Sequence, residues 1–403
     1  MSILSDKHIL LGITGSIAAY KAVELASKLT QAGSQVDVIL TPSAEKFVTA
    51  LTFQSVTGRK AFTEADLWGG QAHVLHVGLG HSVDLLVIAP ATANTIAKLA
   101  HGLADNLLTV TALAAQCPIL IAPAMDVGIY SNPATQENVH LLAARGVHFA
   151  GPAEGRMASG LTGLGRLLEP AELFGHVRLV LGQKGPLAGR KIIVTAGGTQ
   201  EPLDPVRVIT NRSSGKQGYA VAQAALDAGA GVVLVSAPTC LVPPVGAQVV
   251  QAPTVQAMLE AVLLESPKAD ALVMAAAAAD FRSRRVAENK LKRRDGIPQV
   301  ELEAAPDILQ AVLKLGALRP RLLIGFAAES RDLLDNARAK LESKKLDLLV
   351  ANDISAPDAG FGVDTNRVTL LYPDAPAESL PLMDKTEVAE TIIARLAQRL
   401  ENP

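Results

Sequence analysis

The sequence predicts an α/β protein made of two doubly wound, mainly parallel-sheet domains of the Rossmann-like type. Short apolar runs alternate with amphipathic helical patterns through both halves of the chain, which is the rhythm of repeated βαβ units. The apolar runs are continuous, as expected for parallel strands that helices cover on both faces. A length of 403 residues also fits two domains of about 100–200 residues each.

The first half begins with a buried strand, because His8 and the apolar residues after it lead directly into a helical pattern. Further strands and helices alternate, and right-handed crossovers would place these strands in one parallel sheet. We expect strands at residues 8–13, 35–40, 84–89, 118–122 and 147–150, and helices at 18–32, 95–100, 107–115 and 135–145.

A helical pattern at 172–181 is followed by a loop with glycine and proline, and a new strand then begins at Lys191. This punctuation is typical of a connection between domains. We therefore predict a first domain at 1–181, a linker at 182–190 and a second domain at 191–403. There we expect strands at 191–195, 231–236, 271–275, 322–326 and 348–350, a hairpin at 367–372 and 379–382, and helices at 216–228, 332–344 and 385–400.

The composition excludes several classes of protein. Hydrophobic residues make up 49% of the chain, which is enough for large aliphatic cores and excludes a disordered protein. Lys and Arg number 37 against 39 Asp and Glu, so the basic excess of a nucleic-acid binder is missing. Two cysteines, Cys117 and Cys240, are too few for a disulfide framework, and we expect buried thiols. The short polar start and the interrupted apolar runs indicate a cytoplasmic protein without a membrane span.

Three loops after predicted strands of the first half carry small and polar residues. Ligands of doubly wound sheets bind at the carboxyl ends of the strands, where glycines allow close approach and helix amides face an anion. The loops therefore predict a site for a phosphorylated planar cofactor, and their spacing differs from the Gly-x-Gly-x-x-Gly of dinucleotide-binding proteins. Its candidate residues are Gly15, Ser16, Ile17, Thr41, Ser43, Thr92, Ala93, Asn94 and Thr95.

These motifs carry a resemblance to a known family. The segments 15–21, 90–95 and 123–126 resemble the homo-oligomeric flavin-containing cysteine decarboxylases. Over residues 6–400 the chain is similar to the bacterial bifunctional phosphopantothenoylcysteine decarboxylases / phosphopantothenate–cysteine ligases of coenzyme A synthesis. The resemblance implies FMN in the three loops, with Met125 beside it. It also implies flavin-dependent decarboxylation of 4′-phosphopantothenoylcysteine by the first domain.

The resemblance further assigns residues of the decarboxylase. His76, which begins a His-x-x-Leu-x-x-x-x-Asp pattern ending at Asp84, matches the position of the family's active-site base, and an imidazole suits proton exchange near neutrality. Gly160 and Arg166 match the substrate clamp. Leu79 completes the pattern, whereas His73 and His81 do not fit it, and we interpret both as surface histidines.

Two residues depart from the family pattern. Asp126 stands where the family often has an Asn that holds the substrate carboxylate, and Ser159 stands where it often has a proton-donating Cys. An ionised Asp126 would repel that carboxylate, so we expect it to be protonated, rotated away or balanced by a cation. A hydroxyl is a weaker acid than a thiol, so Ser159 would orient a water, or another group would donate the proton.

In the second half the resemblance implies a ligase. Asn211 matches the residue that engages an acyl-nucleotide intermediate, and Ser213, Ser214 and Gly215 follow it in a loop before a helix, where an anion would bind. Lys290 lies in the densest cationic run of the chain, residues 288–294, and matches a lysine of a mobile loop. Such a loop can close over a polyphosphate.

The nucleotide site of this ligase is implied by residues after several strands. Asp280 follows an alanine-rich strand end and could accept hydrogen bonds from ribose, and Lys340 and Lys344 share one helix face. Asn352 and Gly360 also match the family, and we assign them structural roles. The nucleotide-binding candidates are Met274, Ala275, Ala276, Asp280, Lys290, Pro306, Asp307, Ile308, Leu309, Phe326, Lys340 and Lys344.

The implied substrates are 4′-phosphopantothenate, L-cysteine and CTP with Mg²⁺, although the sequence assigns no metal ligands. The family also implies a homo-oligomer, a dodecamer built from trimeric first and dimeric second domains. The alternating pattern would also fit a NAD-dependent dehydrogenase, but the glycine fingerprint of such enzymes is missing from this sequence. A ligase with a flavin-binding but catalytically altered first domain remains open, because Asp126 and Ser159 depart from the pattern.

Overall fold

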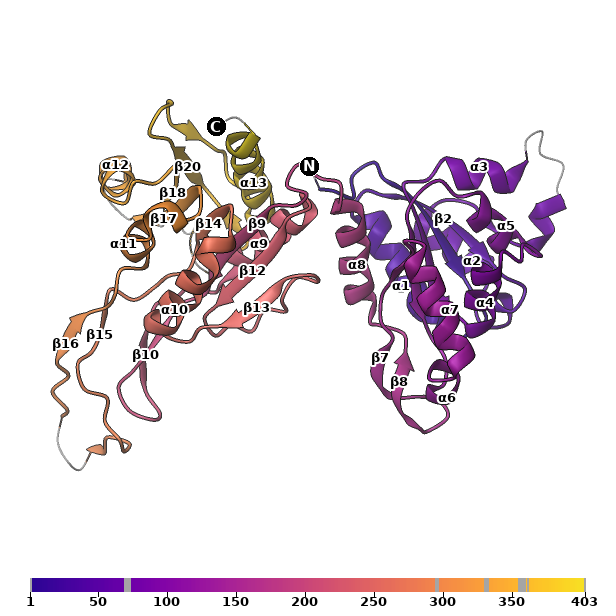
Figure 1. The fold of residues 1–403 in the computed structure, drawn as a ribbon, viewed down its shortest axis with the longest axis horizontal. Coiled ribbons are helices and arrows are strands. Elements are labelled where there is room, and N and C mark those ends of the chain that lie inside the picture. The colour runs from indigo at the N-terminus through magenta and orange to yellow at the C-terminus, as the bar shows by residue number, and fades with distance from the viewer. Residues whose placement is uncertain are drawn as a thin grey trace. The chain divides into compact units, whose positions relative to one another are not determined.

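The computed structural model describes residues 2–68, 74–293, 297–329, 333–353, 360 and 362–401. It divides into two compact units, Met1–Gly182 and Gln183–Pro403. His73 and the last residue of the cationic run, Arg294, lie outside the described residues. Each unit contains a twisted sheet with helices packed on both faces (Figure 1). This confirms the predicted class of doubly wound α/β protein.

The sheet of the first unit is parallel throughout and has the order β3-β2-β1-β4-β5-β6. Its strands are β1 (His8–Ile13), β2 (Gln35–Leu40), β3 (Ala61–Phe62), β4 (Leu85–Ala91), β5 (Ile119–Pro123) and β6 (His148–Phe149). Its longer helices are α1 (Ala19–Gln31), α2 (Ala50–Thr57), α3 (Leu75–His81), α4 (Ala93–His101), α5 (Leu107–Ala114), α7 (Pro133–Ala144) and α8 (Pro170–Gly182). A short α6 (Val127–Tyr130) and a hairpin of β7 (Ala153–Arg156) and β8 (Thr162–Arg166) follow β5 and β6.

Two apolar layers enclose this sheet, because successive side chains of each strand point to opposite faces. Ile9 and Leu11 of β1 pack in one layer with α1, α2 and α8, whereas Leu10 packs in the other with α3, α4, α5 and α7. Helix α1 fits its layer because Ala22, Leu25 and Leu29 share one buried face. These two layers hold the sheet in place, and the loops at its carboxyl edge remain available to bind ligands.

The sheet of the second unit has the order β13-β12-β9-β14-β17-β18-β20-β21. Its first six strands are parallel, and β20 and β21 form the predicted antiparallel hairpin at one edge. These strands are β9 (Lys191–Ala196), β12 (Gly231–Ser236), β13 (Gln248–Gln251), β14 (Ala271–Met274), β17 (Leu322–Glu329), β18 (Leu348–Asp353), β20 (Val368–Leu371) and β21 (Glu378–Ser379). The main helices are α9 (Lys216–Asp227), α10 (Val255–Glu265), α11 (Ile308–Leu313), α12 (Leu333–Ser343) and α13 (Lys385–Glu401).

Two small hairpins extend from the second unit. The first pairs β10 (Gln200–Pro202) with β11 (Val208–Thr210), and the second is an arm that pairs β15 (Phe281–Ser283) with β16 (Leu302–Ala304) (Figure 1). A further two-residue pair joins β19 (Thr365–Asn366) to β22 (Met383–Asp384). Sequence patterns do not predict these pairs, because each strand is too short to show a period.

Other differences from the sequence expectations are local. The sequence did not predict the helices α2, α3, α6, α10 and α11, the strands β3 and β13, or the β7–β8 hairpin. Helix α10 escapes a period analysis because it is apolar around much of its circumference, with Val255, Met258 and Val262 buried. Cys117 is half-buried and Cys240 is exposed, so the expectation of a buried thiol is wrong for Cys240. Among the described residues no helix combines the length and apolar character needed to cross a membrane.

Candidate functional site

The first candidate site lies at the carboxyl edge of β2, β1 and β4, which are neighbours in the sheet. The chain passes from β1 to β2 and β3 on one side and then crosses to β4 on the other side, which makes this edge a topological switch point. The Thr14 hydroxyl donates to the carbonyl of Pro90 at 2.7 Å and accepts from the Thr92 amide at 3.0 Å. This buried threonine therefore ties the loop after β1 to the loop after β4.

The loop after β2 packs against the loop after β1. A Cβ on Gly15 would lie 2.4 Å from the Cβ of Ser43, closer than two carbon atoms can approach. Thr41 donates through its amide to the Ile13 carbonyl at 3.0 Å. Only glycine fits at position 15, because a side chain there would separate these two loops. Together with the hydrogen bonds of Thr14, this close approach gathers the predicted residues of all three loops at one edge.

Helix α4 begins at this edge and provides amides for an anion. Thr92 is its N-cap and accepts from the Thr95 amide at 3.4 Å. Ala93 and Asn94 form the first turn, where backbone amides point out of a helix. Ser16 accepts from the Ala18 amide at 3.3 Å before α1. Glycine, hydroxyls and helix starts at one edge fit a phosphorylated cofactor.

At the end of β5, the loop with Met125 and Asp126 receives the β7–β8 hairpin. The Met125 amide donates to the Gly165 carbonyl at 2.9 Å, and a Cβ on Gly165 would lie 2.2 Å from the Met125 carbonyl oxygen. Figure 1 shows this hairpin beside α6. The hairpin therefore packs on the loop that follows β5, and β5 is the neighbour of β4 in the sheet.

The two residues that depart from the family pattern meet in this structure. The Ser159 hydroxyl donates to Oδ2 of Asp126 at 2.6 Å. Oδ1 of Asp126 accepts from the Gly128 amide at 3.0 Å and caps α6. The hydrogen bond from Ser159 and then that from Gly128 lower the pKa of the Asp126 carboxyl below its ordinary value. Among the expected alternatives for Asp126, which were protonation, rotation away or balance by a cation, these contacts oppose protonation because they stabilise the carboxylate.

The remaining decarboxylase candidates lie on two elements. Gly160 lies in the turn between β7 and β8 with a φ of +85°, and Arg166 at the end of β8 donates to Glu169 at 3.0 Å. His76 lies half-buried in α3. Asp84, which ends its motif, bonds Lys7 at 2.8 Å and the His8 amide at 2.9 Å. The two ends of the motif therefore differ in role: His76 is a site candidate, whereas Asp84 anchors the start of β1.

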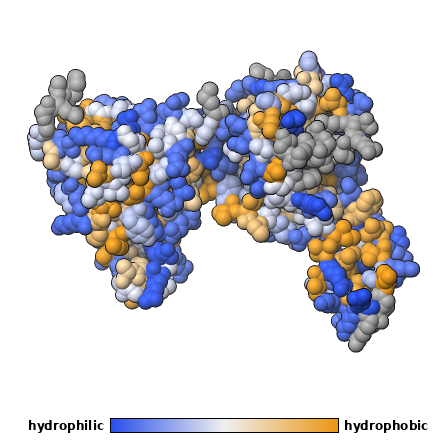
Figure 2. Space-filling view, turned by 180° about the vertical axis from the view of Figure 1, so that it is seen from behind, coloured by the Kyte–Doolittle hydropathy of each residue, from blue (hydrophilic) through white to orange (hydrophobic). Residues whose placement is uncertain are grey.

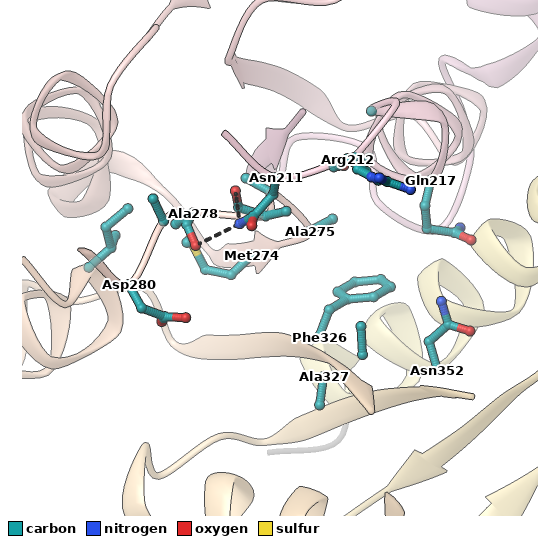
Figure 3. A pocket seen from close by; sticks show the side chains of 18 of the residues that line it. Asn211, Arg212, Gln217, Met274, Ala275, Ala278, Asp280, Phe326, Ala327 and Asn352 are labelled. Carbon is teal, nitrogen blue, oxygen red and sulfur yellow. Dashed lines mark hydrogen bonds between the residues drawn. The ribbon is translucent and has the colours of Figure 1, made fainter. Parts of the chain in front are cut away.

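The second candidate site is a pocket of about 860 Å³ at the carboxyl edge of the second sheet. Figure 3 shows its lining, with the Phe326 ring between Met274 on one side and Asn352 on the other. Among the nucleotide-binding candidates the pocket is lined by Met274, Ala275, Ala276, Asp280, Pro306, Asp307, Ile308, Leu309, Phe326, Lys340 and Lys344. Asn211, Ser213, Ser214 and Gly215 also line it, whereas Lys290 does not.

Asn211 is held against the loop after β14. Its Nδ2 donates to the carbonyls of Ala277 at 3.1 Å and Ala278 at 3.3 Å (Figure 3). A Cβ on Gly198 would lie 2.8 Å from the Asn211 carbonyl oxygen, so the chain after β9 also approaches closely. The amide group of Asn211 is therefore oriented by backbone contacts.

Two lysines also line the pocket, Lys340 in α12 and Lys344 immediately after the end of this helix. Lys340 donates to the Phe326 carbonyl at 2.8 Å, and Lys344 forms an ion pair with Asp307. Burial would raise the pKa of the Asp307 carboxyl, but the bond from Lys344 and that from the Gln310 amide outweigh it and lower the pKa. Asp307 also caps α11. A phosphate entering here would meet cations already placed by the fold.

Asn352 is a pocket residue for which the sequence suggested only a structural role. It lies on β18, its side chain lines the pocket, and it is 8% exposed. Within the described part of the chain its Oδ1 has no hydrogen-bond partner, which is costly for a buried acceptor. A donor group on a ligand would satisfy it. Its place at the carboxyl end of a parallel strand is the signal that could have identified it.

The described residues do not form a metal site by themselves. Over residues 2–68, 74–293, 297–329, 333–353, 360 and 362–401, no three His, Cys, Asp or Glu side chains gather as a potential metal site. Mg²⁺ typically binds through one or two carboxylates together with substrate phosphates.

Comparisons with known proteins cover both halves. A family model described as Flavoprotein matches residues 2–179, and one described as DNA/pantothenate metabolism flavoprotein C-terminal domain matches residues 187–400. The chain is 42% identical over 398 residues to the Coenzyme A biosynthesis bifunctional protein CoaBC of Bacillus subtilis (strain 168), covering 98% of this chain and 97% of the relative. It is 45% identical over 401 residues to the protein of the same name from Mycobacterium tuberculosis, covering 96% and 95%.

Solved structures resemble one half at a time. The C-terminal domain of a Coenzyme A biosynthesis bifunctional protein CoaBC is 39% identical, with a TM-score of 0.47, and the match covers 55% of this chain and 100% of that one. The FMN binding protein AtHal3 is 33% identical, with a TM-score of 0.39, and the match covers 43% and 96%.

Proposed function

Because this chain belongs to the family of bifunctional coenzyme A biosynthesis proteins, we propose that it performs two successive reactions. The second half joins 4′-phosphopantothenate to L-cysteine at the expense of CTP. The first half decarboxylates the product, 4′-phosphopantothenoylcysteine, to 4′-phosphopantetheine with FMN. The observation that carries the proposal is the pocket at the carboxyl edge of the second sheet, which collects residues from widely separated segments at the edge where α/β proteins bind nucleotides.

The flavoprotein half would hold FMN in the loops after β1, β2 and β4. Amides at the starts of α1 and α4 would receive its phosphate, together with the hydroxyls of Ser43 and Thr92. When bound, the flavin supplies an acceptor and donor of electron pairs for the cysteine-derived thiol. His76 exchanges protons in this scheme, and Gly160 and Arg166 close the hairpin over the substrate.

The ligase half would bind CTP with Mg²⁺ in its pocket. The amides at the start of α9, with Ser213 and Ser214, would receive phosphate groups. Lys340 and Lys344 would neutralise charge on the phosphates, and Asp280 would accept hydrogen bonds from ribose hydroxyls. Asn352 joins this set, because a buried acceptor without a partner in the described structure is suited to a donor group of the ligand.

The ligase reaction would proceed in two steps. The carboxylate of 4′-phosphopantothenate attacks the α-phosphorus of CTP, which releases pyrophosphate and leaves an acyl cytidylate. The amine of cysteine then attacks the activated carbonyl and releases CMP. Asn211, fixed by the carbonyls of Ala277 and Ala278, would orient the acyl phosphate, and Lys290 would stabilise the charge that develops in transfer.

A homo-oligomer, up to the dodecamer of trimeric first and dimeric second domains, is part of the proposal. Its support is exposed apolar surface on the β15–β16 arm and the neighbouring β10–β11 hairpin, seen at the lower right of Figure 2. The residues are Val206, Val208, Phe281, Ile297, Val300 and Leu302, of which Ile297 is 96% exposed. Surface of this kind favours association, and light scattering coupled to size exclusion would measure the assembly.

One observation favours a second candidate, a ligase whose flavin-binding half has lost decarboxylation. Asp126 is stabilised as a carboxylate by Ser159 and Gly128, and an anion there would repel a substrate carboxylate. The deciding experiment supplies 4′-phosphopantothenate, cysteine, CTP and Mg²⁺ to the purified protein and follows pyrophosphate and CO₂ separately. Both products support the two-step function, pyrophosphate alone supports the ligase-only form, and neither product refutes the proposal.

A further inference from the structure

Asp204 is a buried carboxylate whose two oxygens serve two different parts of the second unit. Its side chain is 0% exposed. Oδ1 accepts from the amides of Val206 and Arg207, both at 2.8 Å, and these bonds close the turn between β10 and β11. Oδ2 accepts from Arg207 Nη1 at 2.8 Å and from the amide of Leu291 at 3.1 Å. The second oxygen thus reaches a segment 87 positions further along the chain.

Two more bonds join the same pair of segments. Arg207 Nη1 donates to the Leu291 carbonyl at 2.9 Å, and the Ala287 amide donates to the Leu203 carbonyl at 2.9 Å. Residues 287–291 are therefore bound at both ends to the turn at 203–207. Lys290 lies inside this stretch, immediately before Leu291.

The same turn is also connected to Asn211. Strand β11 runs from the turn to Thr210, and Asn211 follows directly. Asn211 is held in the pocket by the carbonyls of Ala277 and Ala278. The β10–β11 hairpin therefore connects the two ligase candidates: Asn211 follows its second strand, and its turn binds the segment that contains Lys290. Asp204 lies in that turn.

The electrostatics of Asp204 keep it in the form that accepts these bonds. Burial would raise the pKa of the Asp204 carboxyl, but the amides of Val206, Leu291 and Arg207 and the charge of Arg207 outweigh burial and lower it. The carboxylate is therefore ionised at neutral pH, with four donor contacts around its two oxygens.

We propose that Asp204 is a positioning residue of the ligase, which sets the location of Lys290 relative to Asn211 through the bond from Oδ2 to the Leu291 amide. This inference rests on the proposed function, because it requires Lys290 to take part in ligation. A residue that only closed its own turn would need Oδ1 alone. The contact of Oδ2 with the Leu291 amide is what a positioning role requires.

The two oxygens allow a selective test. Asp204→Asn retains an acceptor at Oδ1 for the turn, where Asn is also favoured, but it presents an NH₂ group to the Leu291 amide. Donor then faces donor, and the bond is lost. We expect kcat of ligation to fall at least about tenfold, while the Kd for CTP by calorimetry changes by less than about twofold, because Asp204 does not line the pocket.

A double variant tests whether Asp204 acts through Lys290. In a Lys290→Gln background, Asp204→Asn should cause no further loss of kcat, because residues that act as a unit are not additive. Glu201→Gln is the matched control. Glu201 is a buried carboxyl of the same hairpin, 3% exposed, that accepts from the Val255 amide at 2.9 Å. Its effect should multiply with that of Lys290→Gln.

Further measurements separate the possible failures. Hydrogen exchange of the amides of 287–291 should accelerate in Asp204→Asn and not in Glu201→Gln, and thermal melts check that the second unit of each variant is folded. If Lys290→Gln leaves ligation unchanged, the role of Lys290 in the proposed function fails. If Lys290→Gln impairs ligation but Asp204→Asn does not, or if their effects multiply, the positioning role of Asp204 is refuted.

Discussion

The hydroxyl of Ser159 donates a hydrogen bond of 2.6 Å to the carboxylate of Asp126. These residues lie 33 positions apart, on the turn of the β7–β8 hairpin and at the N-cap of α6. Each alone departs from the pattern of the resembled family, in which Asn and Cys often stand at these positions. Their contact indicates that the two departures form one unit, with a hydroxyl donor matched to a carboxylate acceptor.

The first prediction concerns this pair. Asp126→Asn or Ser159→Cys alone should each lower decarboxylation, because each leaves one partner without its match. The double variant should be more active than the product of the two single effects predicts. CO₂ release from 4′-phosphopantothenoylcysteine measures the effect, and ligation by the other half serves as the internal control. If the effects of the two single substitutions simply multiply in the double variant, the contact does not contribute to decarboxylation.

The second prediction concerns the flavin loops. Gly15→Ala should abolish or strongly weaken FMN binding, because the added Cβ would lie 2.4 Å from the Cβ of Ser43 and separate the loops. Visible absorbance after reconstitution with FMN measures the loss. Gly78→Ala is the control, since a Cβ there meets no atom within 4 Å. Retention of flavin by Gly15→Ala would mean that this close approach does not form the cofactor site.

The third prediction concerns Asn352, whose replacement should affect thermal stability and CTP binding in opposite directions. Asn352→Leu should leave the thermal stability of the apo protein unchanged or raised, because it removes a buried acceptor that lacks a partner in the described structure. The same change should weaken CTP binding by about 5- to 30-fold, the equivalent of one hydrogen bond of about 1–2 kcal/mol. Calorimetry with CTP and thermal melts provide the two readouts.

Asn132→Ala is the control for this prediction, because Asn132 caps α7 in the other unit. It should lower stability by about 1 kcal/mol without changing CTP affinity. If Asn352→Leu destabilises the apo protein and leaves the CTP affinity unchanged, its role is structural, as the sequence suggested.

The fourth prediction concerns acid stability of the first unit. Asp37 on β2 is 6% exposed and bonds Arg59 at 2.7 Å and His8 at 2.7 Å. Burial would raise the pKa of the Asp37 carboxyl, but the bonds from His8 and Arg59 outweigh it and the pKa is lowered. A lowered native pKa stabilises the fold above the unfolded value of about 3.9, and this contribution is lost as pH falls through the native value.

Asp37→Asn should therefore destabilise the first unit by about 2 kcal/mol at pH 7, the worth of a hydrogen bond between charged groups. The difference from wild type should shrink below about pH 4. Urea unfolding followed by flavin fluorescence at several pH values measures it. An equal difference at pH 7 and pH 3 would contradict the assignment.

Much of the fold was predictable because its signals are local. Buried parallel strands such as β1 and β12 are continuous apolar runs, and α1 and α13 repeat apolar residues along one face. The predicted pocket residues follow from the same logic, since residues just after parallel strands converge at one edge. Short pairs such as β10–β11 and β15–β16 were missed because two or three residues show no period.

The order of residues along the chain was sufficient for the doubly wound class, the small and polar residues at strand ends and the likeness to a known family. Only the folded chain revealed that Ser159 meets Asp126, that Oδ2 of Asp204 reaches Leu291, and that Asn352, whose buried Oδ1 has no partner in the described structure, lines a pocket. The physical reason is that periodicity and turn chemistry act over a few residues. Hydrogen bonds across 33 or 87 positions form only where the packing of separate elements brings their atoms within about 3 Å.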